Sequence, residues 1–133
     1  LTIEKINLFY TNLEDTKLGP GWSWDDYDTY YAPERSALPL YGNIVTMDQG
    51  DSLFVSPSYF KENVSVINAN RRRSMHENKF YLNPSKKDTV EVPYITDSSA
   101  VKGILEDILK KKIKIGINYG VWFIQISWMK ISI

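Results

Sequence analysis

Hydrophobic and polar positions alternate over much of the chain, which indicates several β-strands. Alternation over residues 3–10 predicts a half-buried first strand. Two β-prone runs, residues 43–47 and 52–56, flank the turn-forming sequence Asp-Gln-Gly-Asp at residues 48–51 and therefore predict a β-hairpin. Further strands are expected at residues 63–68, 79–82, 89–95 and 113–117.

A different period over residues 99–112 predicts an amphipathic helix. Its apolar positions share one face at the helical spacing: Val101, Ile104, Leu105, Ile108 and Leu109. Asp97 or Ser98 can cap its amino end, and three lysines at residues 110–112 oppose the helix dipole at the other end. The pattern as a whole predicts an α+β fold with mainly antiparallel strands and hairpins, and with one principal helix packed on the sheet.

Residues 19–40 fit neither period, because glycines and prolines interrupt a run of aromatic residues. We expect an ordered loop with one short helical turn. The aromatic side chains can form the apolar core of this loop, which is the favoured interpretation, or they can stack on a ligand such as a sugar ring. The candidate ligand-binding residues are Trp22, Trp24, Tyr27 and Tyr31.

The composition is that of a globular protein, with 43% hydrophobic and 24% charged residues among 133. This length predicts one domain, which we place at residues 1–117, followed by an atypical apolar tail at residues 118–133. Sixteen basic residues balance sixteen acidic ones, so no nucleic-acid partner is expected. The start of the chain lacks the pattern of a signal peptide, and residues 121–129 are too short and too polar for a transmembrane helix.

The segment Gly19-Pro20-Gly21-Trp22-Ser23-Trp24-Asp25-Asp26 is the most distinctive motif in the chain. Tyr30-Tyr31-Ala32, Ser36-Ala37-Leu38 and Asn43 follow it in order. This succession resembles class C low-molecular-mass penicillin-binding proteins, the D-Ala-D-Ala carboxypeptidase/endopeptidase family. The resemblance covers roughly residues 16–117. In that family this region is inserted into the catalytic domain, so the motif residues Gly19, Pro20, Gly21, Trp22, Trp24, Asp25, Asp26, Ser36 and Asn43 are expected to have a structural role.

The catalytic motifs of the family are incomplete in this chain. Its activity requires Ser-x-x-Lys, Ser-x-Asn and Lys-Thr-Gly, and the last two do not occur here. Three Ser-x-x-Lys strings begin at Ser58, Ser99 and Ser127, whereas roughly one is expected by chance, which is a weak excess for so short a pattern. An unassisted serine is a poor nucleophile, so we expect no catalytic residue and no enzyme activity from this chain alone.

The resemblance implies an accessory insert of a serine-type peptidoglycan carboxypeptidase in the periplasm or cell envelope. The expected partners are the remainder of the catalytic domain and peptidoglycan, and no cofactor is expected. The alternative is a module that binds glycan or peptide through the aromatic loop. Because the resemblance ends near residue 117, the apolar tail suggests a truncated or shifted reading frame.

Other polar groups favour structural roles. The single histidine, His76, lacks a second imidazole at metal-binding spacing, so a surface loop position is expected and no metal site. Asp25, Asp26 and Asp28 can supply a carboxylate pair for glycoside chemistry, but capping of turns is favoured. The basic run at residues 71–73 can bind an anionic wall polymer or nucleic acid, but a solvated loop is favoured because the formal net charge of the chain is zero.

Overall fold

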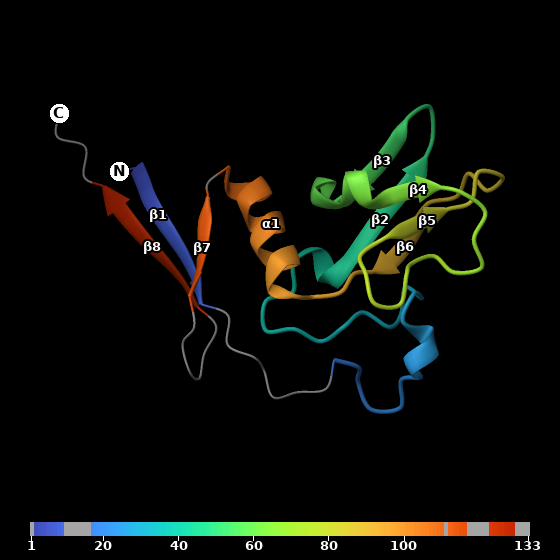
Figure 1. The fold of residues 1–133 in the computed structure, drawn as a ribbon, viewed down its shortest axis with the longest axis horizontal. Helices are drawn as coiled ribbons and strands as arrows, with labels where there is room; N and C mark the ends of the chain where they lie inside the picture. The colour runs from blue at the N-terminus through green and yellow to red at the C-terminus, as the bar shows by residue number, and fades with distance from the viewer. Residues whose placement is uncertain (1, 10–16, 111, 117–122, 130–133) are drawn as a thin grey trace. The chain divides into compact units, whose positions relative to one another are not determined.

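The computed structural model describes residues 2–9, 17–110, 112–116 and 123–129 (Figure 1). The chain divides into two compact units. Unit 1 comprises Leu1–Glu14 with Asp97–Ile133, and unit 2 comprises Asp15–Thr96. The described residues combine strands with one α-helix, which confirms the predicted α+β class. The boundary predicted between residues 117 and 118 lies outside the described residues.

Unit 2 contains a three-stranded antiparallel sheet. It is formed by β2 (Ile44–Gln49), β3 (Leu53–Ser56) and β6 (Val90–Pro93), in the order β3–β2–β6. The hairpin of β2 and β3 is confirmed, and Met47 lies opposite Val55 in its register. The turn sequence between these strands thus connects them as the pattern predicts.

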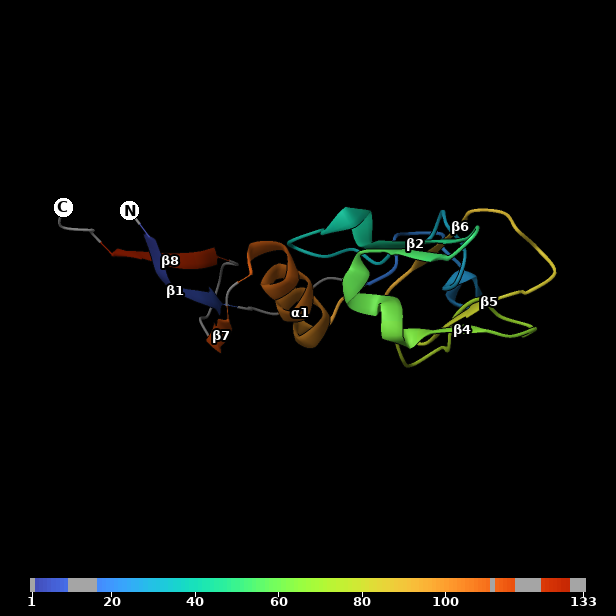
Figure 2. The same cartoon turned by 90° about the horizontal axis from the view of Figure 1, so that it is seen from above.

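A second, smaller layer of unit 2 contains β4 (Val64–Val66) and β5 (Phe80–Leu82). These strands pair in parallel, which the hydrophobic pattern did not predict. The 3₁₀ helix η3 (Ser58–Asn63) leads from β3 to β4, and in Figure 2 it descends from the layer of β2 and β6 to that of β4 and β5. Arg73 pairs with Phe80 as an isolated antiparallel bridge, so the basic run lies alongside β5.

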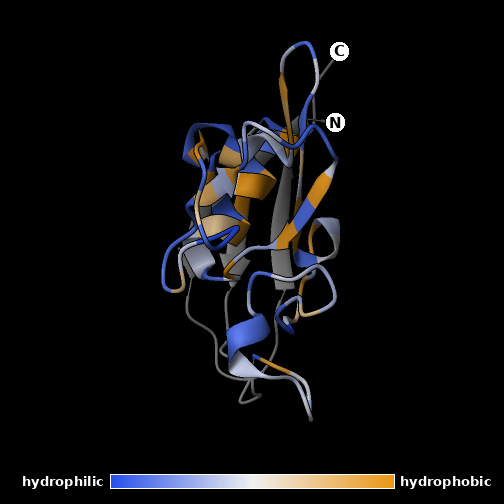
Figure 3. Ribbon diagram, turned by 90° about the vertical axis from the view of Figure 1, so that its right-hand side faces the viewer, coloured by the Kyte–Doolittle hydropathy of each residue, from blue (hydrophilic) through white to orange (hydrophobic). Residues whose placement is uncertain are grey.

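The core of unit 2 lies between these strands. The Phe60 ring is in contact with the rings of Phe80 and Tyr94, with centroid distances of 5.4 and 5.0 Å. Aromatic pairs at such distances add to the stabilisation from burial alone. The other buried apolar residues of the strands are Val45, Met47, Val55, Leu82 and Val92. Figure 3 shows hydrophobic colour concentrated on strands, whereas the connecting loops are largely hydrophilic or neutral.

Unit 1 contains the predicted amphipathic helix, α1 (Ser98–Leu109). Its amino end is capped by Asp97, whose carboxylate accepts a 2.7 Å hydrogen bond from the backbone N–H of Ala100. Lys110 adopts a left-handed conformation with φ of 52°, so the helix ends three residues before the predicted end at residue 112. On the apolar face Val101, Ile104 and Leu105 are buried, whereas Ile108 and Leu109 are exposed.

The sheet of unit 1 contains β1 (Thr2–Phe9), β7 (Ile113–Gly116) and β8 (Phe123–Met129). β1 is the central strand, parallel to β7 and antiparallel to β8. The backbone N–H of Ile113 donates a 2.9 Å hydrogen bond to the Glu106 carboxylate, which links the start of β7 to the helix. Part of the predicted apolar tail therefore forms β8, whereas residues 118–122 and 130–133 lie outside the described residues.

Candidate aromatic binding site

The aromatic loop, defined here as residues 18–31, begins with a tight turn. The backbone N–H of Trp22 donates a 3.2 Å hydrogen bond to the carbonyl of Gly19. Pro20 and Gly21 occupy the two central positions, and Gly21 has a φ of 79° that a side chain would strain. A Cβ at Gly19 would lie 3.1 Å from the Trp22 indole, so a side chain at this position would require the indole to shift by a few tenths of an ångström.

Beyond the turn, the loop contains the short 3₁₀ helix η1 (Trp24–Asp26), as predicted. The expectation that the indoles form an apolar loop core is wrong. The exposed fractions are 39% for Trp22 and 68% for Trp24. Tyr30 and Tyr31 are also exposed, and their rings contact each other edge to face at 5.4 Å. The loop instead presents aromatic surface to solvent, and hydrogen bonds hold its backbone.

The buried carboxylate of Asp28 is the main anchor of the loop. It accepts a 2.8 Å hydrogen bond from the backbone N–H of Arg72, and it forms an ion pair with the Arg71 guanidinium at 3.3 Å. Arg71 also donates to the backbone carbonyl of Asp25 at 2.9 Å. Two segments more than 40 residues apart are thereby joined. Asp25 accepts a hydrogen bond from the Ser23 hydroxyl, which lowers the pKa of the Asp25 carboxyl.

Tyr27 lies under the same basic run. The guanidinium carbons of Arg71 and Arg73 lie 5.4 and 5.2 Å from the centre of its ring, within the range of cation–π attraction. Arg71 and Arg72 are exposed, but Arg73 is only 2% exposed. The predicted solvated loop is therefore confirmed for two of the three arginines and wrong for Arg73, whose backbone pairs with β5 and places its side chain inside unit 2.

A cavity of about 360 Å³ lies beside Tyr27 and Arg73. Its lining comes from three parts of unit 2: the aromatic loop with the residue before it, the segment that follows the loop, and residues 73–76 at the end of the basic run and just after it. The lining residues are Lys17, Leu18, Trp24, Tyr27, Ala32, Glu34, Arg73, Met75 and His76. This volume is within the range of small-molecule sites, and the exposed indole of Trp24 at its border is available to a ligand.

One side of the cavity is held by a polar network around Glu34. The Glu34 carboxylate accepts hydrogen bonds from the backbone N–H and the hydroxyl of Thr96, at 2.9 and 2.8 Å. Lys17 donates to the Thr96 carbonyl at 2.9 Å and to the Thr96 hydroxyl at 2.7 Å, and its ammonium lies 3.7 Å from the same carboxylate. Glu34 is therefore occupied by neighbouring protein groups.

The backbone next to Glu34 is fixed by Asn43, at the end of the 3₁₀ helix η2 (Tyr41–Asn43). Its side-chain amide donates to the Glu34 carbonyl at 2.8 Å and to the Ser36 hydroxyl at 2.9 Å. The two motif residues Ser36 and Asn43 are thus directly bonded. Tyr94 completes the group, since its backbone N–H donates to the Asn43 carbonyl and its hydroxyl donates to the Leu40 carbonyl.

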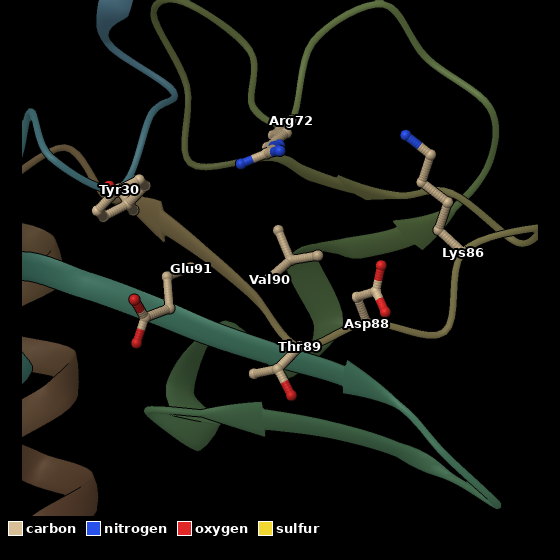
Figure 4. Close-up of a pocket in the computed structure, with 7 residues that line it drawn as sticks. All are labelled: Tyr30, Arg72, Lys86, Asp88, Thr89, Val90 and Glu91. Atoms are coloured by element: carbon tan, nitrogen blue, oxygen red, sulfur yellow. The ribbon is translucent and has the colours of Figure 1, made fainter.

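A second cavity, of about 540 Å³, lies on another part of unit 2 and has a more polar lining (Figure 4). Tyr30, Arg72, Lys86 and Val90 face this space, whereas Thr89 and Glu91 point to the opposite side of the strand. Thr89 donates a 2.8 Å hydrogen bond to Asp48 there. The lining contains two cations, Arg72 and Lys86, and two carboxylates, Asp88 and Glu91.

The candidate serines are dispersed: Ser58 lies in η3, Ser99 in the first turn of α1 and Ser127 in β8. His76 is exposed as expected and belongs to the lining of the 360 Å³ cavity. Within the described ranges, His, Asp and Glu side chains form no group of three suited to a metal ion. No helix in the described part of the chain has the length and apolar character needed to cross a membrane.

The structure therefore brings together two of the four candidate ligand-binding residues. Trp24 and Tyr27 line the 360 Å³ cavity, whereas Trp22 packs over Gly19 and Tyr31 contacts Tyr30. Glu34 and Met75 were not identified as site residues from the sequence, because nothing in their local pattern distinguishes them from ordinary loop residues. Arg73 was noted only as part of the basic run, whose three arginines look alike in sequence.

Comparison with known proteins gives no match of any of the three kinds: no family model, no curated protein and no solved structure. The geometry of the cavity and the motif residues themselves therefore carry the function proposed below.

Proposed function

We propose that this chain is a non-catalytic accessory region of a protein related to serine-type D-Ala-D-Ala carboxypeptidases, and that its aromatic loop binds peptide from peptidoglycan at the cell envelope. The relationship to that family is supported by the ordered motif GPGWSWDD, YYA, SAL and Asn43. The binding role is supported chiefly by one observation. Trp24, 68% exposed, lies with Tyr27 at the border of the same cavity.

The physical case for binding is the cost of exposing a large aromatic side chain. Burial of an aromatic side chain is worth about 2 to 3 kcal/mol, so an indole left in solvent forgoes that stabilisation within its own fold. Covering the indole with a ligand would recover part of it. The charged groups on the same lining favour a ligand that carries polar groups as well as apolar ones.

Tryptophan fluorescence during titration with a peptidoglycan stem pentapeptide tests this proposal. We expect a saturable change in the whole chain, loss of that change in Trp24→Phe and its retention in Trp22→Phe. The second variant is a matched control, because Trp22 belongs to the same loop and does not line the cavity. Absence of any change at millimolar peptide, with the protein folded by circular dichroism, would contradict the proposal.

Stacking of a glycan ring on Trp24 is the second candidate function. It is favoured specifically by the exposure of the indole, since sugar rings bind to flat aromatic faces. A disaccharide of N-acetylglucosamine and N-acetylmuramic acid, which lacks the peptide, separates the two functions. A response to the disaccharide and none to the pentapeptide would assign the site to glycan.

The absence of catalysis by this chain is tested with fluorescent penicillin. We expect no covalent adduct, because Ser-x-Asn and Lys-Thr-Gly are missing and a serine without an activating partner reacts slowly. An adduct that survives denaturing electrophoresis would contradict this part of the proposal.

A further inference from the structure

Arg73 is a buried cation whose hydrogen bonding is incomplete. Its side chain is almost fully buried, and it donates a 3.1 Å hydrogen bond to the backbone carbonyl of Pro93. Its Nε is buried and has no hydrogen-bond partner within the described residues. Burial lowers the pKa of the guanidinium, although the nearby Glu34, Tyr27 and Asp28 oppose this shift. A buried charge without a full set of partners is destabilising, so its position calls for a physical explanation.

The protein itself does not supply a carboxylate ligand to Arg73. Among the described residues no carboxylate lies within ion-pair distance of its guanidinium, and Glu34 is the carboxylate of the cavity lining. Glu34 is bonded to Thr96 and Lys17, as described above. Lys17 and Arg73 together outweigh Glu34, so the lining retains a net positive charge.

The apolar side of the cavity lies next to this charge. Trp24, Tyr27 and Met75 line it together with Leu18 and Ala32. An apolar body beside a guanidinium is suited to a ligand that combines an apolar group with an anion. A guanidinium binds a carboxylate or a phosphate through two parallel hydrogen bonds, and a peptide carries a carboxylate at its C-terminus.

We propose that the cavity binds peptides by their C-terminal carboxylate, with Arg73 as the anion-binding residue and with Trp24 and Tyr27 in contact with the terminal side chain. This inference depends on the proposed peptide-binding function and specifies which end of the peptide enters the cavity. The carboxylate supplies an acceptor to the Arg73 guanidinium, whose Nε has no hydrogen-bond partner among the described residues.

Calorimetric titration of the whole chain with two pairs of small peptides tests the inference. The first pair is N-acetyl-D-alanyl-D-alanine and its C-terminal amide, and the second is N-acetylphenylalanine and its amide. We expect each acid to bind at least about tenfold more tightly than its amide, because a hydrogen bond to a charged group is stronger than one to a neutral group.

The outcomes distinguish the two proposals. Equal binding of acids and amides would overturn carboxylate recognition while leaving a peptide-binding function. Discrimination confined to the phenylalanine pair would support the carboxylate site and contradict a peptidoglycan ligand. Absence of heat from all four compounds at millimolar concentration would overturn both.

Two neighbouring variants locate the anion-binding residue. Arg73→Gln should abolish the preference for acids, and Arg72→Gln should preserve it, because Arg72 is exposed and does not line this cavity. A preference that survives in folded Arg73→Gln would overturn the role of Arg73. If that variant does not fold, the comparison of acid and amide in the unaltered chain still decides whether the carboxylate is recognised.

Discussion

The side-chain amide of Asn43 donates a 2.9 Å hydrogen bond to the hydroxyl of Ser36. The same amide donates to the Glu34 carbonyl at 2.8 Å, so the chain entering β2 holds the segment that carries a lining residue of the candidate site. Asn43 has a φ of 59°, in the left-handed region that asparagine tolerates better than most residues. Asn43 therefore positions the segment that carries Glu34 and Ser36.

Replacing Asn43 with alanine should lower the free energy of unfolding by about 2 to 4 kcal/mol. The change removes the two hydrogen bonds that the buried Asn43 amide donates. It also places alanine at positive φ, where it lacks the short polar side chain that lets asparagine adopt this conformation. Asn43→Gly is the matched control, because glycine removes the bonds but tolerates the backbone conformation. Urea denaturation should show a smaller loss for glycine than for alanine, and equal stability of Asn43→Ala and the unaltered chain would contradict the assignment.

Removal of the Asp28 carboxylate should loosen the connection between the aromatic loop and the basic run. Asp28→Ala leaves the backbone N–H of Arg72 without this acceptor, so we expect a loss of about 1 to 3 kcal/mol in urea denaturation. Asp51→Ala, in the exposed turn between β2 and β3, should change stability by less than about 0.5 kcal/mol. Similar losses from both substitutions would argue against a specific anchor at Asp28.

Stability at high pH should depend on Tyr94. Burial raises the pKa of its phenol well above the ordinary value of about 10. Its neutral form is therefore favoured by the folded state, and the stability it contributes is complete below pH 10. As the pH rises further, the unfolded phenol ionises first, so this contribution declines.

The variant Tyr94→Phe provides the comparison. At neutral pH it should be less stable than the unaltered chain by about 1 kcal/mol, because the hydrogen bond to Leu40 is lost. Denaturation curves measured at increasing alkaline pH should converge for the two proteins. A difference that stays constant up to the pH at which both unfold would show that Tyr94 ionises alike in folded and unfolded states.

The cap of α1 should contribute measurably to unit 1. Asp97→Ala removes the acceptor of the 2.7 Å hydrogen bond from Ala100, and we expect a loss of about 1 kcal/mol. Asp97→Asn keeps a good capping residue and should cost less. Thermal denaturation followed by circular dichroism of the helix measures both, and an alanine variant as stable as the asparagine variant would contradict the capping role.

Local sequence determined the elements that depend on interactions between residues close together in the chain. The helical spacing of apolar residues and the aspartate before them specify α1, and the Asp-Gln-Gly-Asp turn between two β-prone runs specifies the hairpin of β2 and β3. Gly19-Pro20-Gly21 likewise carries the tight turn that begins the aromatic loop, because proline and glycine restrict or extend the range of φ independently of distant contacts.

Tertiary structure alone decided the environment of each side chain in the candidate site. The bond between Arg72 and Asp28 spans 44 residues and the bond between Thr96 and Glu34 spans 62, so periodicity within a short window carries no information about either. For the same reason three consecutive arginines look alike in sequence, although pairing with β5 buries Arg73 and leaves its neighbours exposed.

The tryptophans illustrate the same division. Their abundance in residues 19–40 was apparent from the sequence, and packing of the loop on the basic run then determined that Trp24 lies exposed at a cavity border and not in a core. Burial is a property of how distant segments meet, and hydrophobic character expresses only a tendency toward it.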